Sequence, residues 1–249
     1  MASHRATPPG PDRGWPRSSP NSAMPERSFL RQRSQAIFQD GRRLFTRSII
    51  PEGIQREGMW LRDWDPRHSK LAAAILKGAE QIGLREHDIV LYLGASTGTT
   101  ASHVSDIVGN RGFVFALDCA PRVIRDLVFV CERRKNMTPI LADAAQPDTF
   151  AERVTMVDYV YQDIAQRDQA RIFLLNCSRF LEIGGFAALC VKARSIDVAR
   201  HPREIFLETR KLLEEHLTIV DSRELEPFER DHCIFFCKKT RAFTIGTFI

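Results

Sequence analysis

The sequence lacks the features that mark membrane-spanning and secreted proteins. It has no run of about 18 apolar residues, and its first residues lack the apolar stretch expected of a secretory signal. None of the six cysteines forms a Cys-x-x-Cys pair, so we expect no metal site, only buried small side chains in a reducing compartment. The 249 residues, 43% hydrophobic and 27% charged, suffice for one large α/β domain with a small appendage.

A broadly basic main body is also absent. The net charge is +5, but residues 1–50 hold nine Arg against three acidic residues, whereas residues 51–249 hold 27 Lys and Arg against 28 Asp and Glu. The basic excess therefore belongs to the N-terminal part, where it suits either attraction of nucleic acid or a merely soluble tail. Any RNA-binding face on the main body must be local.

Neither common nucleotide-binding fingerprint is present, since the chain has no Gly-x-Gly-x-x-Gly turn and no Gly-Lys-Ser/Thr. The stretch Ile89–Thr100 instead joins a short apolar run to turn glycines at Gly94 and Gly98 and to a helix start. Such a corner brings backbone and helix N–H groups close to a ligand in doubly wound sheets. On its own it is equally compatible with glycines that serve packing.

The composition divides the chain into four segments. Residues 1–25 contain six of the 13 prolines and are expected to be disordered. Residues 26–66 are expected to form a small β subdomain, because residues 42–64 alternate apolar and charged positions around turn glycines. Residues 67–240 form the main domain, and residues 241–249 a short tail.

Strand and helix patterns alternate through the main domain, with no internal repeat. The expected helices cover residues 71–78, 121–134, 169–181 and 202–216, besides the one that begins near Thr99. The expected strands cover residues 89–93, 112–118, 138–143, 156–163, 186–192, 217–225 and 232–239, with a tight turn at 183–185. This order predicts an α/β fold with a doubly wound seven-stranded sheet, whose last strand is antiparallel because no helix precedes it.

Charged residues gather where the parallel strands end. Ligands of doubly wound sheets bind beyond the carboxyl ends of the strands, and that edge collects the glycine turn with Asp118, Asp143, Asp163 and Lys192. Any single acid at such a position can instead cap the next helix. The full set favours a ligand site.

Each of these residue types suits a particular chemistry. Asp118 follows the glycine turn by about 20 residues and is placed to accept ribose hydroxyls. Asp143 suits either an adenine amino group or the orientation of a helix. Lys192 lies on the strand next to Asp163 and can accept a proton only if its pKa falls, which burial and a second cation such as Lys70 favour. The alternative for Lys192 is a surface Lys at a strand end.

Lys70 and His232 are ambiguous by themselves. Lys70 occupies the first turn of a helix, where the macrodipole disfavours a cation, although a solvated Lys is the commoner explanation. A lone His that opens a strand, as His232 does, is more often structural.

Five stretches together resemble the fibrillarin family of RNA 2′-O-methyltransferases, especially its archaeal branch. They are WDPRHSKLAAAI (64–75), LYLGASTGTTASHV (91–104), YQDIAQ (161–166), VKARSID (191–197) and LEPFERDH (225–232). The resemblance extends over residues 42–239. It implies a Rossmann-like methyltransferase domain that transfers a methyl group from S-adenosylmethionine to ribose 2′-hydroxyls of rRNA or tRNA.

The resemblance also implies residue roles and partners. The implied catalytic set is Lys70, Asp163, Lys192 and His232. The implied cofactor contacts are Thr99, Thr100, Asp118, Cys119, Asp143, Ala144, Asp163, Ile164, Ala165 and Gln166. The implied partners are a box C/D guide RNA with its target, a Nop-domain scaffold protein and a kink-turn-binding protein, in the cytoplasm for the archaeal kind and in the nucleolus for the eukaryotic kind.

The chain departs from the family pattern in two places. Cys119 stands where the family has an aromatic residue, so we expect weaker packing against the cofactor. The N-terminus is rich in Pro, Arg and Ser and lacks the Gly-Arg-rich segment of eukaryotic members, which favours either the archaeal kind or an atypical chain start. Two alternatives stay open: a small-molecule methyltransferase, which rarely needs both lysines, and a non-catalytic assembly subunit, which does not need the four-residue set.

Overall fold

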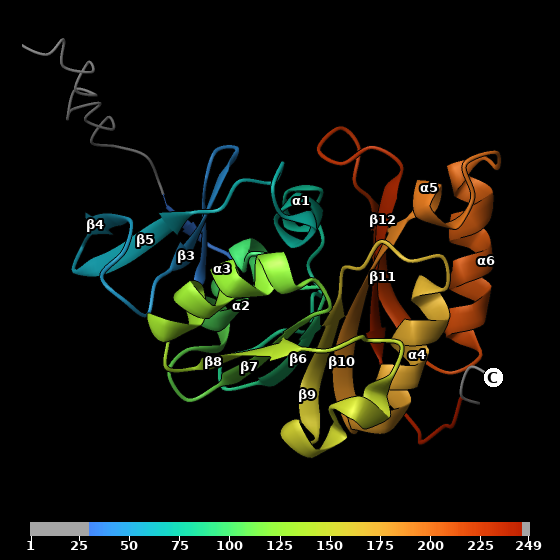
Figure 1. Cartoon of the computed structure of the whole chain (residues 1–249). Helices are drawn as coiled ribbons and strands as arrows, with labels where there is room; N and C mark the ends of the chain where they lie inside the picture. Colours follow the sequence, from blue (N-terminus) through green and yellow to red (C-terminus); the bar gives the residue numbers. More distant parts are fainter. Residues whose placement is uncertain (1–29, 246–249) are drawn as a thin grey trace, which may run out of the picture.

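The structure is a computed structural model that describes residues 30–245; the predicted disordered tail, residues 1–25, and the last four residues of the chain lie outside it. Seven strands form one sheet, in the order β11-β12-β10-β9-β6-β7-β8 (Figure 1). They are β6 (Ile89–Leu93), β7 (Phe113–Asp118), β8 (Met137–Leu141), β9 (Val157–Gln162), β10 (Leu181–Lys192), β11 (Thr218–Glu224) and β12 (His232–Lys238). Strand β12 runs antiparallel to both β10 and β11, and the other neighbouring strands pair in parallel. The predicted sheet, with its antiparallel last strand, is confirmed.

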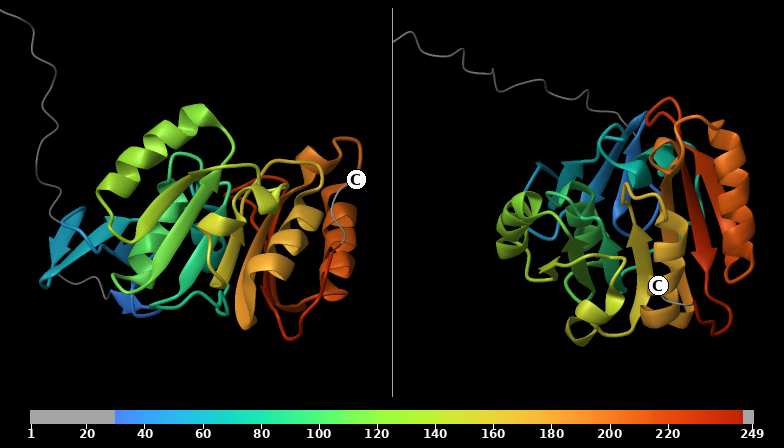
Figure 2. Two further views of the ribbon diagram at one scale, coloured as in Figure 1. Left: turned by 60° about the horizontal axis from the view of Figure 1, so that its bottom comes forward. Right: turned by 45° about the vertical axis from the view of Figure 1, so that its right-hand side comes forward.

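Helices cover both faces of this sheet (Figures 1 and 2). Alternate side chains of β6 show the division: Val90 and Tyr92 join the core under one set of helices, and Leu91 and Leu93 join the core under the other. The first set is α1 (Lys70–Leu76), α2 (Thr99–Val108) and α3 (Pro121–Glu132). The second set is α4 (Gln169–Phe180) and α6 (Pro202–Glu214), with a short α5 (Ala193–Ile196) and two 3₁₀ turns (Pro147–Thr149 and Ala151–Arg153) besides.

The N-terminal appendage is a five-stranded antiparallel sheet, in the order β1-β2-β3-β5-β4. Its strands are β1 (Arg31–Gln32), β2 (Ile37–Asp40), β3 (Arg43–Arg47), β4 (Ile54–Arg56) and β5 (Met59–Asp63). Ile37 and Leu44 share a hydrophobic core with Val104 of α2. The predicted β-appendage is therefore present and packs against the main domain.

A buried ionic cluster reinforces this packing. Asp106 of α2 is 2% exposed and accepts hydrogen bonds from the Thr46 hydroxyl (2.9 Å) and the Ile49 amide (3.2 Å). It also accepts from the guanidinium groups of Arg62 (2.7 Å) and Arg134 (2.6 Å). Four donors, three of them from the appendage, thus converge on one carboxylate, which fixes the appendage to α2.

One local expectation needs correction. The tight turn expected at residues 183–185 lies inside β10, because Gly184 donates its amide to the Lys239 carbonyl (2.6 Å) and Gly185 accepts from the Lys239 amide (3.0 Å). The pairing of β10 with β9 changes register there, between Leu181 and Phe186. In the predicted C-terminal tail, Phe243 stacks on His216 with ring centroids 5.1 Å apart. Across residues 30–245, no helix is long and apolar enough to cross a membrane.

Candidate active site

A cavity of about 270 Å³ lies at the carboxyl ends of β6, β7 and β9. The structure brings seven of the ten predicted cofactor contacts into its wall: Asp118, Cys119, Ala144, Asp163, Ile164, Ala165 and Gln166. The wall also contains Gly94, Ser96 and Leu117, which were not among the predicted contacts. The sequence could have predicted these three. Gly94 and Ser96 belong to the glycine turn that follows β6, and Leu117 pairs with Leu93, the last residue of β6.

Glycine is required where the turn passes Asp163. Gly94 has φ +83°, and a Cβ atom there would lie 2.2 Å from the Asp163 carbonyl oxygen. Gly98, at φ +91°, directly precedes α2 and offers no side chain to cap it. The first two residues of this helix are Thr99, which is exposed, and Thr100, which is buried. Neither lines the cavity, and no side chain caps the N–H groups at the start of the helix.

Asp118 is held by two backbone amides. Its Oδ2 accepts from the Ser96 amide (2.8 Å) and its Oδ1 from the Ala120 amide (3.0 Å). Each carboxylate oxygen keeps a further lone pair, so Asp118 can still accept two hydroxyl groups. Cys119 beside it is exposed, against the expectation that all the cysteines are buried. Partial desolvation of its thiol, together with the carboxylates of Asp118 and Asp143, raises the pKa of that thiol. The thiol is therefore protonated at neutral pH.

Asp143 lies outside the cavity wall. It follows the end of β8 by two residues, and its Oδ1 accepts the Ala145 amide at 2.9 Å in a local turn. This geometry orients the chain around Ala144, a local role that differs from the orientation of a helix considered for Asp143.

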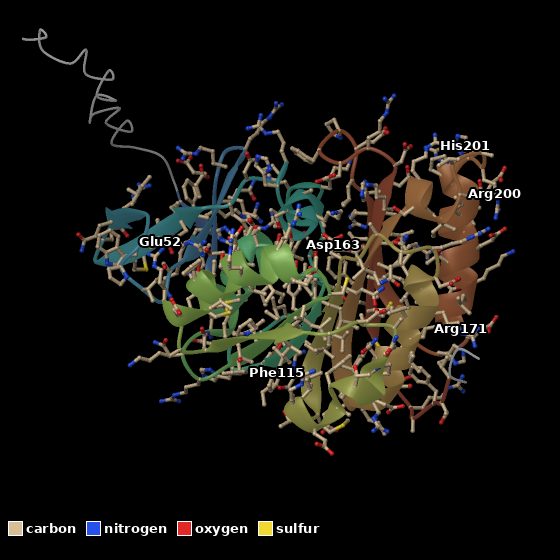
Figure 3. All side chains as sticks on the ribbon, in the orientation of Figure 1. Glu52, Phe115, Asp163, Arg171, Arg200 and His201 are labelled. Carbon is tan, nitrogen blue, oxygen red and sulfur yellow. The ribbon has the colours of Figure 1, made fainter. Side chains whose placement is uncertain are left out.

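Asp163 pairs with Lys70 and not with Lys192. The Lys70 Nζ donates to Asp163 Oδ2 at 2.8 Å, with 18% and 25% of the two side chains exposed. Figure 3 marks Asp163 close to α1, the helix that Lys70 begins. Burial alone would lower the pKa of the Lys70 ammonium, but the attraction and hydrogen bond of Asp163 outweigh it and hold that pKa above its ordinary value. Lys70 is thus a fixed cation, and its charge is balanced by Asp163 at a helix end that disfavours it.

Lys192 and His232 are direct partners in the pairing of β10 with β12. His232 is 8% exposed, and its Nδ1 donates to the Arg230 carbonyl at 2.6 Å. Burial lowers the pKa of His232 and nearby Lys70 lowers it further, against the opposite effect of that carbonyl. The ring is therefore neutral at pH 7, with a free lone pair on Nε2.

Lys192 is exposed. This corrects the expectation that burial prepares its amine to accept a proton. Over the described part of the chain, its amine forms no hydrogen bond or ion pair. The burial invoked to make this amine a proton acceptor is therefore absent from the chain alone. Only a bound partner or substrate can supply it.

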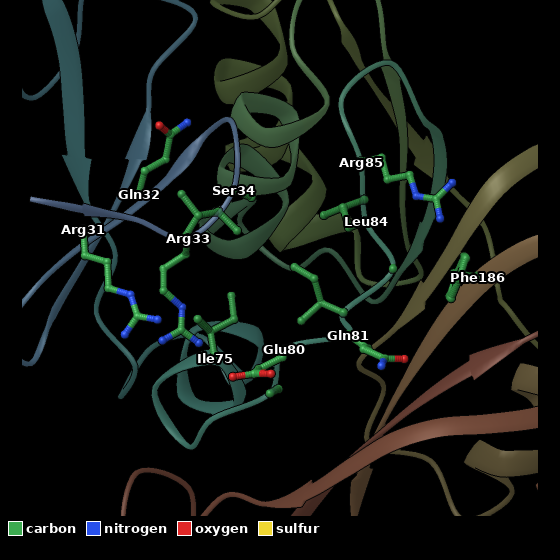
Figure 4. A pocket seen from close by; sticks show the side chains of 14 residues that line it. Arg31, Gln32, Arg33, Ser34, Ile75, Glu80, Gln81, Leu84, Arg85 and Phe186 are labelled. Atoms are coloured by element: carbon green, nitrogen blue, oxygen red, sulfur yellow. The ribbon is translucent and has the colours of Figure 1, made fainter.

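The other large cavities contain none of the predicted site residues. One of about 520 Å³ lies between β1 and the segment after α1, where Arg31 and Arg33 stand on one side and Arg85 and Phe186 on the other (Figure 4). Another, of about 590 Å³, lies between α6 and the edge strand β11. Asp118 and Asp163 line the 270 Å³ cavity, and Lys70 reaches its wall through the ion pair with Asp163. Lys192 and His232 pair with each other on β10 and β12 and are not part of that wall.

Comparison with known proteins shows which family this chain resembles. The sequence profile of the fibrillarin family matches residues 38–241. A fibrillarin-like rRNA/tRNA 2′-O-methyltransferase of Thermococcus onnurineus is 43% identical over 211 residues, which cover 82% of this chain and 93% of that protein. The structure of Aeropyrum pernix fibrillarin with natively bound S-adenosyl-L-methionine is 40% identical with a TM-score of 0.73, covering 81% of this chain and 92% of the other. A chain in the structure of a fibrillarin–Nop5p complex is 36% identical with a TM-score of 0.76, covering 82% of this chain and 98% of the other.

Proposed function

This chain belongs to the fibrillarin family, and from that premise we propose that it is an S-adenosylmethionine-dependent RNA 2′-O-methyltransferase. The observation that carries the proposal is the placement of the Lys70–Asp163 pair at the wall of the cavity at the carboxyl ends of β6, β7 and β9. The names of the Thermococcus and Aeropyrum relatives support the activity and the cofactor.

The residues of the cavity fit an adenosine-containing cofactor. Asp118 keeps one lone pair on each carboxylate oxygen for ribose hydroxyls, and its charge disfavours a phosphate at the same place. The uncapped N–H groups of α2 suit a carboxylate group. When bound, S-adenosylmethionine supplies a methyl group already activated by a sulfonium centre.

The chain's own residues then position the ribose hydroxyl and remove its proton. Lys70 keeps its proton, so it contributes a fixed positive charge and holds Asp163 in place. We assign proton acceptance to Lys192: the 2′-oxygen gives its proton to the Lys192 amine as it bonds to the methyl carbon, and the sulfur keeps the electron pair of the broken bond. The bound target strand covers the exposed Lys192, and neutral His232 lines the nucleotide pocket beside it.

We further propose that the enzyme works in a box C/D ribonucleoprotein. The fibrillarin–Nop5p structure supports a Nop-domain scaffold as partner. A guide RNA and a kink-turn-binding protein are inferred from family membership. Residues 51–249 hold 27 basic and 28 acidic residues, so the body itself has no charge excess to collect RNA, which suits a target delivered by guide pairing.

Single-turnover methylation of a guide-paired target tests the role of Lys192. Lys192→Ala should lower the rate by more than about 100-fold and leave cofactor affinity unchanged in calorimetry. Lys192→Arg should also be slow, because a guanidinium does not release its proton near neutral pH. The matched control is Lys135→Ala, which removes an exposed Lys in the turn between α3 and β8. An Arg variant as fast as the wild type would show that Lys192 is only a charge, and lost cofactor binding in the Ala variant would place it in the cofactor pocket.

A further inference from the structure

The end of strand β10 depends on a side chain from another element. Register pairing of β10 with β9 stops at Leu189 opposite Gln162, because β9 ends there and the chain turns into the cavity wall at Asp163. Lys192, three residues further along β10, therefore has no strand partner on that side. Its backbone N–H and C=O still need partners where they are shielded from water.

Gln169, the first residue of α4, supplies these partners. Its side-chain Oε1 accepts the Lys192 amide at 3.0 Å, and its Nε2 donates to the Lys192 carbonyl at 3.2 Å. The carboxamide thus hydrogen-bonds both the N–H and the C=O of Lys192, as a neighbouring strand would. Gln169 is fully buried, and its own backbone carbonyl accepts from the side chain of Gln162 at 2.6 Å.

The same carboxamide reaches the cofactor cavity. The Gln169 Nε2 also donates to the carbonyl of Gln166 at 2.9 Å, and Gln166 lines the cavity. One buried side chain therefore links the segment after β9, which forms the cavity wall, to the end of the strand that presents Lys192.

The hydrogen bonds to Gln169 also determine how Lys192 meets His232. Since the N–H and C=O of Lys192 point toward Gln169, they point away from β12, and the carbonyl of His232 is taken by the Leu225 amide (2.9 Å) on the far side. Lys192 and His232 are thus a non-hydrogen-bonded antiparallel pair, the type in which side chains approach most closely. We propose that Gln169 is a positioning residue that aligns Lys192 with His232 and with the cofactor cavity. This inference rests on the proposed role of Lys192.

The test compares Gln169→Met with a control substitution of another buried amide side chain that forms the same number of hydrogen bonds. Met keeps the length of Gln and removes all three side-chain hydrogen bonds. The control is Asn136→Leu: the Asn136 Nδ2 donates to the carbonyls of Ser105 and Gly109 (both 2.9 Å), and its Oδ1 accepts from the Ser105 hydroxyl (2.7 Å). Both variants lose one acceptor and two donor bonds, so both should show a lower melting temperature.

Rates are measured in single turnover, with saturating S-adenosylmethionine and guide-paired target, at equal distance below each melting temperature. Gln169→Met should be slower than wild type by about 10- to 100-fold, with cofactor affinity from calorimetry within about threefold. Asn136→Leu should stay within about twofold of wild type. A Gln169→Met rate no lower than that of Asn136→Leu would overturn the inference.

Two further variants keep the result interpretable. If Gln169→Met does not fold, Gln169→Glu retains the acceptor for the Lys192 amide and replaces both donors by a carboxylate. Its rate relative to wild type should be low at pH 8 and rise toward pH 6, as protonation restores one donor; a ratio near one at both pH values would overturn the inference. Lys192→Ala separates the two claims. If that variant is as fast as wild type, the proposed role of Lys192 fails; if it is slow while the Gln169 variants are not, only the inference fails.

Discussion

The Lys70–Asp163 pair should contribute a measurable coupling free energy to folding. At 2.8 Å, with an effective dielectric constant of about 20, the attraction amounts to about 6 kcal/mol before desolvation is subtracted. Because both side chains are mostly buried, at 18% and 25% exposed, desolvation removes much of this. We expect a net coupling of about 1.5–3 kcal/mol.

Urea unfolding of Asp163→Asn, Lys70→Met and the double variant measures this coupling as a double-mutant cycle. Each single variant leaves the other charge without its partner, so the double variant should lose less stability than the sum of the two. The pKa of Lys70 is raised in the folded chain. The contribution is therefore complete below the unfolded Lys pKa of about 10.4 and disappears as the pH rises through the folded value.

The matched control is the exposed pair of Arg43 and Asp63, 3.1 Å apart with 45% and 55% of the side chains exposed. Its coupling should be below about 0.5 kcal/mol. If the stability losses of the two single variants at the Lys70–Asp163 pair add up to that of the double variant, the reasoning that these groups form one buried unit is refuted. The Asp163→Asn variant should also transfer methyl groups slowly, because the group that holds Lys70 at the cavity wall is then uncharged.

Three further outcomes follow from the geometry. Asp118→Ala should weaken S-adenosylmethionine binding by about 1–3 kcal/mol in calorimetry, since ribose hydroxyls lose their acceptor; unchanged affinity would remove Asp118 from the site. Asp106→Asn should lower the free energy of unfolding by about 3–5 kcal/mol in urea, because the guanidinium groups of Arg62 and Arg134 lose their fully buried carboxylate partner and keep only the partly exposed Glu52; a loss below about 1 kcal/mol would contradict the cluster's role. Burial raises the pKa of Asp88 to about 6, so the folded chain loses stability as pH rises from about 4 to about 6. Asp88→Asn should remove that loss and stabilise the chain at pH 7 by about 1 kcal/mol after solvent screening; an unchanged pH profile would contradict it.

The main elements were predictable because local pattern and tertiary environment agree. The apolar run at residues 89–93 became β6 with the expected bounds, and Pro121 begins α3 as its fixed φ favours. The misplaced cation at Lys70 was a valid signal, since Asp163 balances its charge. The alternation of strands and helices then predicted the doubly wound seven-stranded sheet.

Other features were not predictable, because they depend on groups far apart in sequence. The sequence pattern treats Arg62, Asp106 and Arg134 as ordinary charged residues of a solvated surface, yet they form one buried cluster. Gln169 looks like a neutral residue at a helix start, and only the end of β9 beside β10 gives its side chain a function. Likewise, strand adjacency suggested that Asp163 meets Lys192, whereas α1 places Lys70 there.

Mapping of ribose methylation after reconstitution tests the central claim most directly. The full chain is combined with S-adenosylmethionine, a Nop-domain scaffold, a kink-turn-binding protein and a guide RNA, and the target RNA is analysed nucleotide by nucleotide for 2′-O-methyl groups. We predict one methylated ribose, at the position that guide pairing specifies, which moves when the guide sequence is changed and disappears with Lys192→Ala. Absence of ribose methylation in the complete assembly, or the same methylation without guide RNA, would contradict the account.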